Sequence, residues 1–484
     1  MARENPRKRR DLTQGPIGST LLLFALPTLG SSVLQSLNGS INAVWVGRFL
    51  GENALAATAN ANLIMFLLNA FVFGFGMAAT ILVGQSFGRR DIDSGRRAIG
   101  TALGAFVPVT VVIAVLGWIF APAILTLLRT PIEAYQPALD YLRVIFLAIP
   151  MSLIVILLMM GLRGAGDSLT PLYFMIVSVI LDSTLNPVFI LGLGPAPRLG
   201  IAGSATATVI ANLVGLATMI GFIYLRDLPL RLRGHELTYL KPDIAMLRTI
   251  MVKGFPMGLQ MIVISLAAIV MIGFVNSEGL ETAAAFGVTQ QLWTYVQMPA
   301  MAIGAAVSAM AAQNIGAGAW DRVSQITRVG IGQNLVLTGA LVVLLLFVDR
   351  PALALFLGGD SPALPIARHI QLVATWNFIL FGVTMVYFGV VRSNGAVVAP
   401  LIILAVSMFP VRLGFIYLAR PFLGTDALWL SFPAGSIVTL VAAAWYYKYG
   451  HWRDAHMSQP VPEVECREEA LGTSEPGGRL NPAA

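Results

Sequence analysis

The sequence predicts an all-α polytopic membrane protein with twelve transmembrane helices in two parallel six-helix lobes. Its 484 residues are 57% hydrophobic and 11% charged, whereas a soluble protein usually carries about 25% charged residues. The apolar residues, at a mean hydropathy of +0.78, form runs long enough to cross a bilayer, which takes roughly 20 residues of helix. The second half of the chain also repeats the first, which indicates two equivalent lobes.

The apolar runs divide into twelve predicted spans, six in each half. In the first half they cover 17–47, 54–86, 98–128, 138–162, 171–193 and 200–225. In the second half they cover 249–275, 282–312, 329–348, 369–391, 399–419 and 427–447. Pro27 and Pro256 each lie in the first span of their half. Because proline removes a helical hydrogen bond, both are candidate conformational residues, although packing alone would also explain them.

The repeat is carried by residues that seldom match by chance. Since each half has an even number of spans, both halves enter the membrane from the same side, and their symmetry axis runs along the membrane normal. Function is therefore expected between the lobes or where they differ. The matched pairs are Gly51 and Gly279, Gly76 and Gly304, Gln85 and Gln313, Gly88 and Gly316, and Asp93 and Asp321 at an offset of 228, and Pro27 and Pro256, Arg163 and Arg392, Gly166 and Gly395, and Pro171 and Pro400 at an offset of 229.

The distribution of positive charge predicts the orientation. With the N-terminus inside, the inner segments hold 23 of the 31 Lys and Arg, and the outer loops hold six. This positive-inside bias accounts for the formal net charge of +7 and argues against nucleic-acid binding. No small-residue cleavage site follows the basic cluster at 7–10, so a cleaved signal is not expected. We expect a monomer in the inner (plasma) membrane, surrounded by lipid, with both termini cytoplasmic.

The predicted domain order follows from these spans and charges. A basic cytoplasmic N-terminus (1–16) precedes the N-terminal six-helix lobe (17–225). A cytoplasmic inter-lobe loop (226–248), the longest and most basic loop, leads into the C-terminal six-helix lobe (249–447). The tail at 448–484 is polar and rich in Pro, Gly and Glu, and is therefore predicted to be disordered.

Several function classes lack the residues they need. The one cysteine, Cys466, lies in the tail, which excludes a disulfide framework or a cysteine-based metal site. All four histidines lie in loops, span ends or the tail, and no GxxxxGK[ST] phosphate loop occurs. An enzyme is therefore not expected, and no cofactor is predicted. The motifs at 85–88 and 313–316 are interpreted as helix ends or hinges at the inner face.

Asp182 is the most informative single residue. It lies near the middle of the span at 171–193, whereas Asp140, the nearest rival, falls in the first turn of its span. An ionisable group at mid-bilayer costs at least roughly 2.5–3.5 kcal/mol, so its presence there asks for a function. We interpret Asp182 as a site for a coupled ion, a proton or Na⁺, in preference to a structural carboxylate.

Polar residues at helical spacing accompany Asp182. Residues four apart in a helix are neighbours, so Ser178 and Asn186 share its face. Each such residue could also serve only to hold helices together. The predicted ion-coupling residues are Asp182, Asn186, Asn42, Ser178, Thr206 and Thr208. Gln35, Asn38 and Asn62 are predicted to belong to the polar lining of the substrate cavity.

The second half has no carboxylate in the middle of a span. The position equivalent to Asp182 is Val411, and its neighbour Arg412 lies within the span at 399–419. Arg412 either anchors the interior or extends its charge outward to the interface. The asymmetry predicts ion coupling in the first half alone. Gln290, Tyr295, Asn377 and Arg412 are predicted to line the substrate cavity.

The chain resembles the multidrug and toxin extrusion (MATE) transporters over about residues 12 to 447. That resemblance implies twelve helices in two lobes, and antiport of organic, often cationic, compounds against protons or sodium. Each motif alone is weak, but together they are specific. The motifs are ALP (Ala25 to Pro27), VGRFLGENALAA (Val46 to Ala57), GQSFGRRD (Gly84 to Asp91), LRGAGDSLTP (Leu162 to Pro171), LGIAGSATAT (Leu199 to Thr208), QNIGAG (Gln313 to Gly318) and Pro410-Val-Arg412.

Three departures from the family pattern bear on the ion. Where the family commonly has an Asp on the first helix, this chain has Asn42. On the fifth helix the usual Asn-then-Asp order is exchanged, giving Asp182 and Asn186. The acidic residue that some members carry on the seventh helix is absent, since Ile264 and Ser265 stand there. One isolated carboxylate suffices for a proton, whereas sodium prefers several anionic oxygens, so a proton is favoured.

The sequence therefore predicts a secondary antiporter that exports small organic compounds, expected to be cationic and amphiphilic, by alternating access of two lobes. The alternative is a flippase for lipid-linked precursors or polysaccharides of related architecture. Such a flippase would line its cavity with several Arg or Lys, of which Arg412 and Arg143 are the candidates. A channel is disfavoured because no repeated pore loop occurs.

Overall fold

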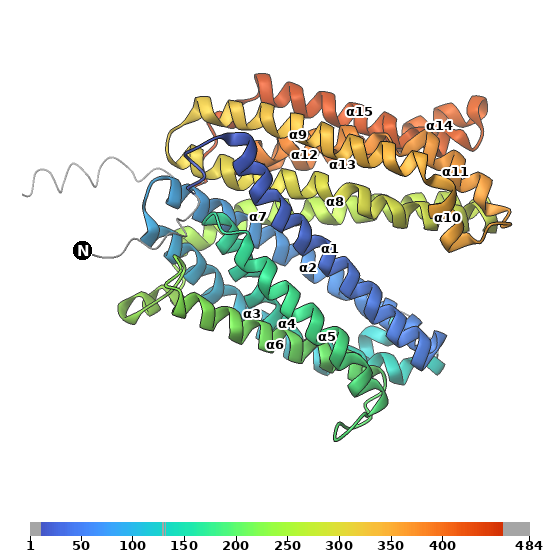
Figure 1. Cartoon of the computed structure of the whole chain (residues 1–484), viewed down its shortest axis with the longest axis horizontal. Coiled ribbons are helices and arrows are strands. Elements are labelled where there is room, and N and C mark those ends of the chain that lie inside the picture. The colour runs from blue at the N-terminus through green and yellow to red at the C-terminus, as the bar shows by residue number, and fades with distance from the viewer. Residues whose placement is uncertain (1–10, 128–129, 131, 458–484) are drawn as a thin grey trace, which may run out of the picture.

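The computed structural model describes residues 11–127, 130 and 132–457, without the side chains of 52–53, 55–64 and 133–134. Of the tail predicted at 448–484, residues 448–457 are described, and the prediction of disorder is wrong for them because Trp452 and Met457 are buried. Residues 458–484, with Cys466, lie outside this range, as do residues 1–10. The described chain is helical throughout (Figure 1). The first half contains α1 (Ile17–Leu50), α2 (Glu52–Gly88), α3 (Ile92–Leu127), α4 (Ile132–Gly164), α5 (Leu169–Leu191) and α6 (Ile201–Leu225).

The second half contains more elements, because several of its helices are broken. A short 3-10 helix, η1 (Gly234–Leu240), connects the halves. The second half then contains α7 (Ile244–Ser277), α8 (Leu280–Gly316), α9 (Trp320–Phe347), α10 (Asp349–Leu357), α11 (Ala363–Ala374), α12 (Asn377–Ser393), α13 (Val398–Val406), the π-helical turn η2 (Ser407–Val411), α14 (Arg412–Leu423), α15 (Asp426–Tyr449) and the 3-10 turn η3 (His451–Arg453).

The predicted all-α fold with twelve spans is confirmed. Within the described ranges, eleven helices are long and apolar enough to cross a membrane. The pair α11 and α12, bent by 44°, passes the same test together and makes the twelfth span. Sequence composition does not signal this bend, because the run at 369–391 is apolar on both sides of it. The predicted span at 399–419 lies in one helix, Val398–Leu423, which contains the π-helical turn η2.

The repeat is visible in the helix lengths. α1 and α7 have 34 residues each, and α2 and α8 have 37 each. Gly51 and Gly279, at φ 83° and 114°, precede α2 and α8, in a backbone region that glycine adopts far more readily than other residues. A helix of 37 residues is roughly 55 Å long, well beyond the roughly 30 Å hydrocarbon core, so α2 and α8 extend past the bilayer.

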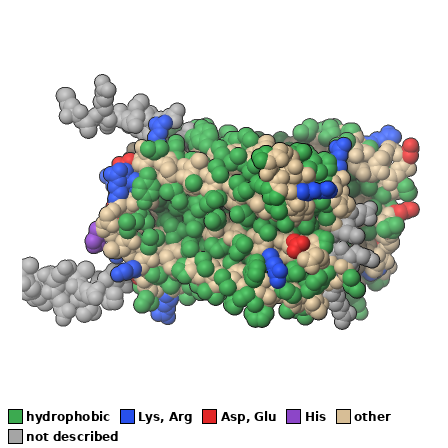
Figure 2. All heavy atoms as spheres, turned by 90° about the horizontal axis from the view of Figure 1, so that it is seen from below, with side chains coloured by type: hydrophobic (Ala, Val, Ile, Leu, Met, Phe, Trp, Pro, Cys, Tyr) green, Lys and Arg blue, Asp and Glu red, His purple; other side chains and the backbone are tan. Residues whose placement is uncertain are grey.

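The helices form two lobes, α1–α6 and α7–α15. The lobes meet at one end of the molecule and diverge toward the other (Figure 1). The meeting end is the predicted inner end. Figure 2 shows a face that is largely hydrophobic, with Lys and Arg toward both ends. The first turns of α1 cross between the lobes, since Leu21 and Phe24 are buried in one apolar cluster with Ile303 and Val307 of α8.

Candidate functional site

Asp182 lies in the interior of the N-terminal lobe. It belongs to α5, a continuous helix of 23 residues, and its side chain is 1% exposed. Asn186, one turn later on the same face, is fully buried. The four-residue spacing thus places both polar side chains on the face that α5 packs against α1 and α6.

Four side chains donate hydrogen bonds to the Asp182 carboxylate. Asn38 Nδ2 and Asn42 Nδ2, both on α1, lie 2.7 and 2.9 Å from Oδ2. Thr208 Oγ1 on α6 and Asn186 Nδ2 lie 3.1 and 3.2 Å from Oδ1. Three helices therefore converge on one buried charge, which would be expensive to bury without such donors.

The same network contains acceptors that could receive an ion. Asn186 Nδ2 also donates to Asn42 Oδ1 at 2.8 Å. The Oδ1 atoms of Asn38 and Asn186 are buried and have no hydrogen-bond partner among the described residues. No group of three or more His, Cys, Asp or Glu side chains gathers anywhere in the described part of the chain. An ion held here would therefore meet one carboxylate together with amide and hydroxyl oxygens.

The structure does not bring every predicted polar residue to Asp182. Thr206 Oγ1 donates to Ala202 O of its own helix at 2.7 Å, and Ser178 Oγ lies 3.5 Å from Ala211 O. Gln35 is exposed, and the side chain of Asn62 is outside the described residues. Asn38, predicted to line the substrate cavity, instead bonds Asp182.

One neighbour of Asp182 was missed. The phenol of Tyr141 on α4 lies close enough to interact electrostatically with the Asp182 carboxylate. The residues three and four positions from Tyr141 on either side are Pro137, Ala138, Val144 and Ile145. All four are apolar, so no polar face marks this part of α4, and the sequence carries no signal that would have selected Tyr141.

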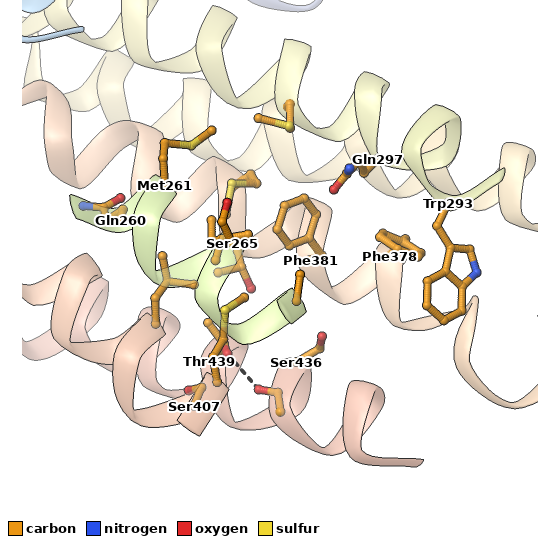
Figure 3. A pocket seen from close by; sticks show the side chains of 18 of the residues that line it. Gln260, Met261, Ser265, Trp293, Gln297, Phe378, Phe381, Ser407, Ser436 and Thr439 are labelled. Atoms are coloured by element: carbon orange, nitrogen blue, oxygen red, sulfur yellow. Dashed lines mark hydrogen bonds between the residues drawn. The ribbon is translucent and has the colours of Figure 1, made fainter. Parts of the chain in front are cut away.

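A cavity of about 400 Å³ lies in the C-terminal lobe, facing α2 of the other lobe. Figure 3 shows side chains from several helices pointing into it, with Trp293, Phe378 and Phe381 on one side and Ser407, Ser436 and Thr439 on another. The predicted residues Gln290, Asn377 and Arg412 line it, and Tyr295 is not among the lining residues. Asp182 does not line it either, so the buried carboxylate and this cavity occupy separate lobes.

A pair of repeated glutamines joins the lobes at the predicted inner end. Gln85 Nε2 of α2 donates to Ser393 O at 2.8 Å, and Gln313 Nε2 of α8 donates to Gly164 O at 2.9 Å. Ser393 is the repeat equivalent of Gly164, at the offset of 229. The two bonds are therefore related by the symmetry of the duplication. We call these two hydrogen bonds the inner latch.

Two repeated glycines let the helices approach at the inner latch. A Cβ atom on Gly88 would collide with the backbone carbonyl of Gln313, and one on Gly316 would collide with that of Gln85. The motifs at 85–88 and 313–316 end α2 and α8, as the sequence indicated. Their role between the lobes was missed, because the spacing within one motif says nothing about its partner.

The two candidate conformational prolines lie inside continuous helices. Pro27 is buried in α1, and Pro256 lies in α7 between Gly254 and Gly258. Both of these glycines pack against α2, where a Cβ on Gly74 would meet the backbone of α7. The first helix of each half is thus held close to the other lobe near its proline.

Two six-helix lobes, one around a buried carboxylate and the other around a cavity, define a multi-pass membrane protein. The family model MatE matches residues 27–188 and 256–418, one match in each half of the chain. The chain therefore belongs to the MATE family of multidrug efflux transporters. The predicted resemblance is confirmed.

Relatives of nearly the same length support this membership. The chain is 35% identical over 448 residues to "Probable multidrug resistance protein YoeA" of Bacillus subtilis (strain 168), covering 92% of this chain and 96% of the relative. It is 29% identical over 450 residues to "Probable multidrug resistance protein YpnP" of the same strain, covering 92% and 98%.

A solved structure shares the fold. It is described as the "Outward-facing conformation of a multidrug resistance MATE family transporter of the MOP superfamily". Its TM-score is 0.81 at 19% sequence identity, and the match covers 93% of this chain and 98% of that one.

Proposed function

We propose that this protein is a secondary antiporter that exports amphiphilic organic compounds in exchange for a proton carried by Asp182. The observation that supports this most directly is the buried Asp182 carboxylate, which accepts four hydrogen bonds from three helices. The compound would occupy the cavity of the other lobe. Loading and unloading of Asp182 would change the bonds between α1, α5 and α6.

The amide groups around Asp182 can follow its protonation. A protonated carboxyl group donates a hydrogen bond and therefore needs an acceptor. Rotation of the Asn38 amide by half a turn would replace its donating Nδ2 with Oδ1, which is otherwise unpaired among the described residues. The proton is favoured over Na⁺ because one carboxylate suffices for it, and none of the four side chains that hydrogen-bond Asp182 is acidic.

The proposed transport cycle is a rocking of the lobes, taken as residues 17–225 and 249–447 about the segment 226–248. The lobes diverge at the predicted outer end (Figure 1) and are joined at the inner latch. Opening the inner end would have to break the bonds of Gln85 and Gln313. We place the protein as a monomer in the plasma membrane with both termini inside, following its positive-inside charge.

The test is transport by proteoliposomes under a pH gradient or a sodium gradient, imposed separately. Three probes of different charge (ethidium, dansylamide and dansylglycine) keep the result independent of substrate charge. Export driven by the pH gradient, and lost in Asp182→Asn, is the expected result. If export responds only to the sodium gradient, Na⁺ and not the proton is the coupling ion. If none of the probes is exported uphill under either gradient, the proposal is overturned.

A further inference from the structure

We propose that the cavity of the C-terminal lobe takes the oxyanion head of an amphiphilic organic anion, bound by the guanidinium of Arg412. This inference rests on the proposed function, because it names the class of compound that enters the cavity. It departs from the cationic substrate expected from the sequence. Four features support it: the hydrogen-bond donors of Arg412, the charge of the lining, the aromatic and methionine side chains of the lining, and the helix turn that precedes Arg412.

Arg412 is a buried cation with N–H groups that lack hydrogen-bond acceptors among the described residues. Its side chain is 8% exposed, and its Nε and Nη2 atoms are buried without a hydrogen-bond partner among the described residues. Leaving a buried charge unpaired is strongly unfavourable. The Phe432 ring lies under the guanidinium, 4.0 Å from Cζ to the ring centroid, and offsets part of that cost. The N–H groups still need an acceptor.

The cavity offers no acidic partner among the described residues. Its lining contains two arginines, Arg392 and Arg412, and no Asp or Glu. Arg392 already donates through Nε to Phe388 O at 3.0 Å, so Arg412 is the less satisfied of the two. A cavity with this charge attracts anions and repels cations. Two oxygens of a planar carboxylate match the fork of a guanidinium, which makes such pairs strong and directional.

The rest of the lining suits an aromatic or other apolar body. Besides Phe432 it contains Trp293, Phe378 and Phe381 (Figure 3), and methionines, which adapt to irregular ligands. Ser436 Oγ donates to Asn377 Oδ1 at 3.1 Å near the arginine end, and adds polar groups there. Gly435 leaves room for the Arg412 stem, since a Cβ there would lie 2.6 Å from Arg412 Cγ.

The turn η2 explains why Arg412 faces inward. At the repeat offset of 229 residues, the position equivalent to Asp182 is Val411, and Arg412 follows it. The π-helical turn Ser407–Val411 inserts one residue relative to an α-helix, and such insertions occur frequently at functional sites. As a result Arg412 is buried, while Val411 is only partly buried. The second half thus presents a cation at the helix position where the first half presents a carboxylate.

The test measures binding rather than transport, with three probes that share one fluorophore: dansylglycine (anion), dansylamide (neutral) and dansylcadaverine (cation). Purified protein in detergent is titrated at pH 7, and energy transfer from tryptophan to dansyl is recorded against protein-free micelles. The wild type is expected to bind dansylglycine most tightly. Arg412→Gln should weaken dansylglycine binding by about 10- to 100-fold, the loss expected for a charge-assisted pair, and leave dansylamide within about twofold.

Two further variants keep the result interpretable. Arg412→Lys retains the charge without the fork, so it should preserve the preference for the anion in weakened form. Arg143→Gln is the matched control, because Arg143 also has an Nε that is unpaired among the described residues and lies over an aromatic ring, Trp118 at 4.7 Å, but in the other lobe. It should bind all three probes as the wild type does.

The outcomes separate this inference from the proposed function. Tightest binding of dansylcadaverine by the wild type, or an unchanged order of the three probes in Arg412→Gln, would overturn the anion site. Asp182→Asn should bind dansylglycine normally, because it leaves the cavity intact. Normal uphill transport by Asp182→Asn would instead overturn the coupling role while leaving the binding result in place.

Discussion

The two lobes repeat one sequence pattern, but they differ at α5 and at the equivalent helix of the second half. In the N-terminal lobe α5 is continuous and buries Asp182 among four donors. In the C-terminal lobe the equivalent segment is α13, η2 and α14, and it buries Arg412 beside a cavity. The comparison shows one repeated frame with two different interiors, which is what our proposal of an ion site in one lobe and an organic-compound site in the other requires.

Where the lobes have to meet, they have stayed alike. Gln85 and Gln313 make equivalent bonds across the interface, and Gly88 and Gly316 allow equivalent backbone approaches. Gln85 joins α2 to the end of α12, and Gln313 joins α8 to the end of α4, so the two bonds hold the same end of the molecule through different pairs of helices. The contact between the lobes is thus alike in both halves, whereas their interiors differ.

The largest effect is expected from Asp182→Asn, which removes the charge that distinguishes the first lobe. Uphill transport under a pH gradient should fall to background, because the amide has no proton to exchange, while the protein remains folded in the membrane. Asp140→Asn is the control, because Asp140 is an exposed carboxylate on α4 that accepts a hydrogen bond from Gln136 of the same helix. If Asp182→Asn carries out coupled transport at the wild-type rate, the Asp182 carboxylate has a structural role and does not carry the coupled ion.

The next largest effect is expected at the inner latch, where the lobes are alike. Gly316→Ala adds a Cβ that collides with Gln85 O, so it should destabilise the closed inner end and reduce transport severalfold. Gly287→Ala introduces the same change on the same helix, where a Cβ meets nothing within 4 Å. Equal transport rates in the two variants would show that the close approach at Gly316 is dispensable.

Much of the fold and part of the Asp182 site could be predicted from helical periodicity. Spacing by three and four residues places Asn38 and Asn42 on one face of α1, and Asp182 and Asn186 on one face of α5, whatever the helices pack against. Two polar faces buried in one lobe tend to meet, since neither can be satisfied by lipid. This is why these four residues are found together.

Two features could not be predicted from the sequence. One is which face of a helix packs toward Asp182, and the other is where a helix departs from regular α-helical geometry. Thr206 and Thr208 lie about 200° apart around α6, and only packing decides which one reaches Asp182. The turn η2 lies in an apolar run whose composition suits an unbroken helix equally well. The sequence left both an interior position and one extended to the interface open for Arg412, and the inserted residue of η2 accounts for its burial.

A third experiment makes the first lobe more acidic. Asn42→Asp would place a second carboxylate beside Asp182, where Asn42 Nδ2 lies 2.9 Å from Oδ2. Two adjacent carboxylates cannot both stay ionised without a cation, so the variant should gain a dependence on sodium. Transport is measured across sodium concentrations at fixed pH, with Asn69→Asp, an exposed site on α2, as the control. An unchanged sodium response would mean that Asn42 does not share the ion with Asp182.

The smallest effect is expected from a pair of threonines that look equivalent in the sequence. Thr208→Val removes the hydroxyl that donates to Asp182 Oδ1 at 3.1 Å but retains the shape of the side chain. Loss of one hydrogen bond to a carboxylate should change coupled transport by about 2- to 10-fold. Thr206→Val removes a hydroxyl that bonds only its own helix, at Ala202 O, and should leave coupling unchanged. The informative measurement is transport as a function of pH. A pH profile that shifts in Thr208→Val but not in Thr206→Val would show that the Thr208 hydroxyl bonds the group whose protonation controls transport. Equal profiles in both variants would mean that the Thr208 hydroxyl does not affect ion binding, and that α1 and α5 hold the ion without α6.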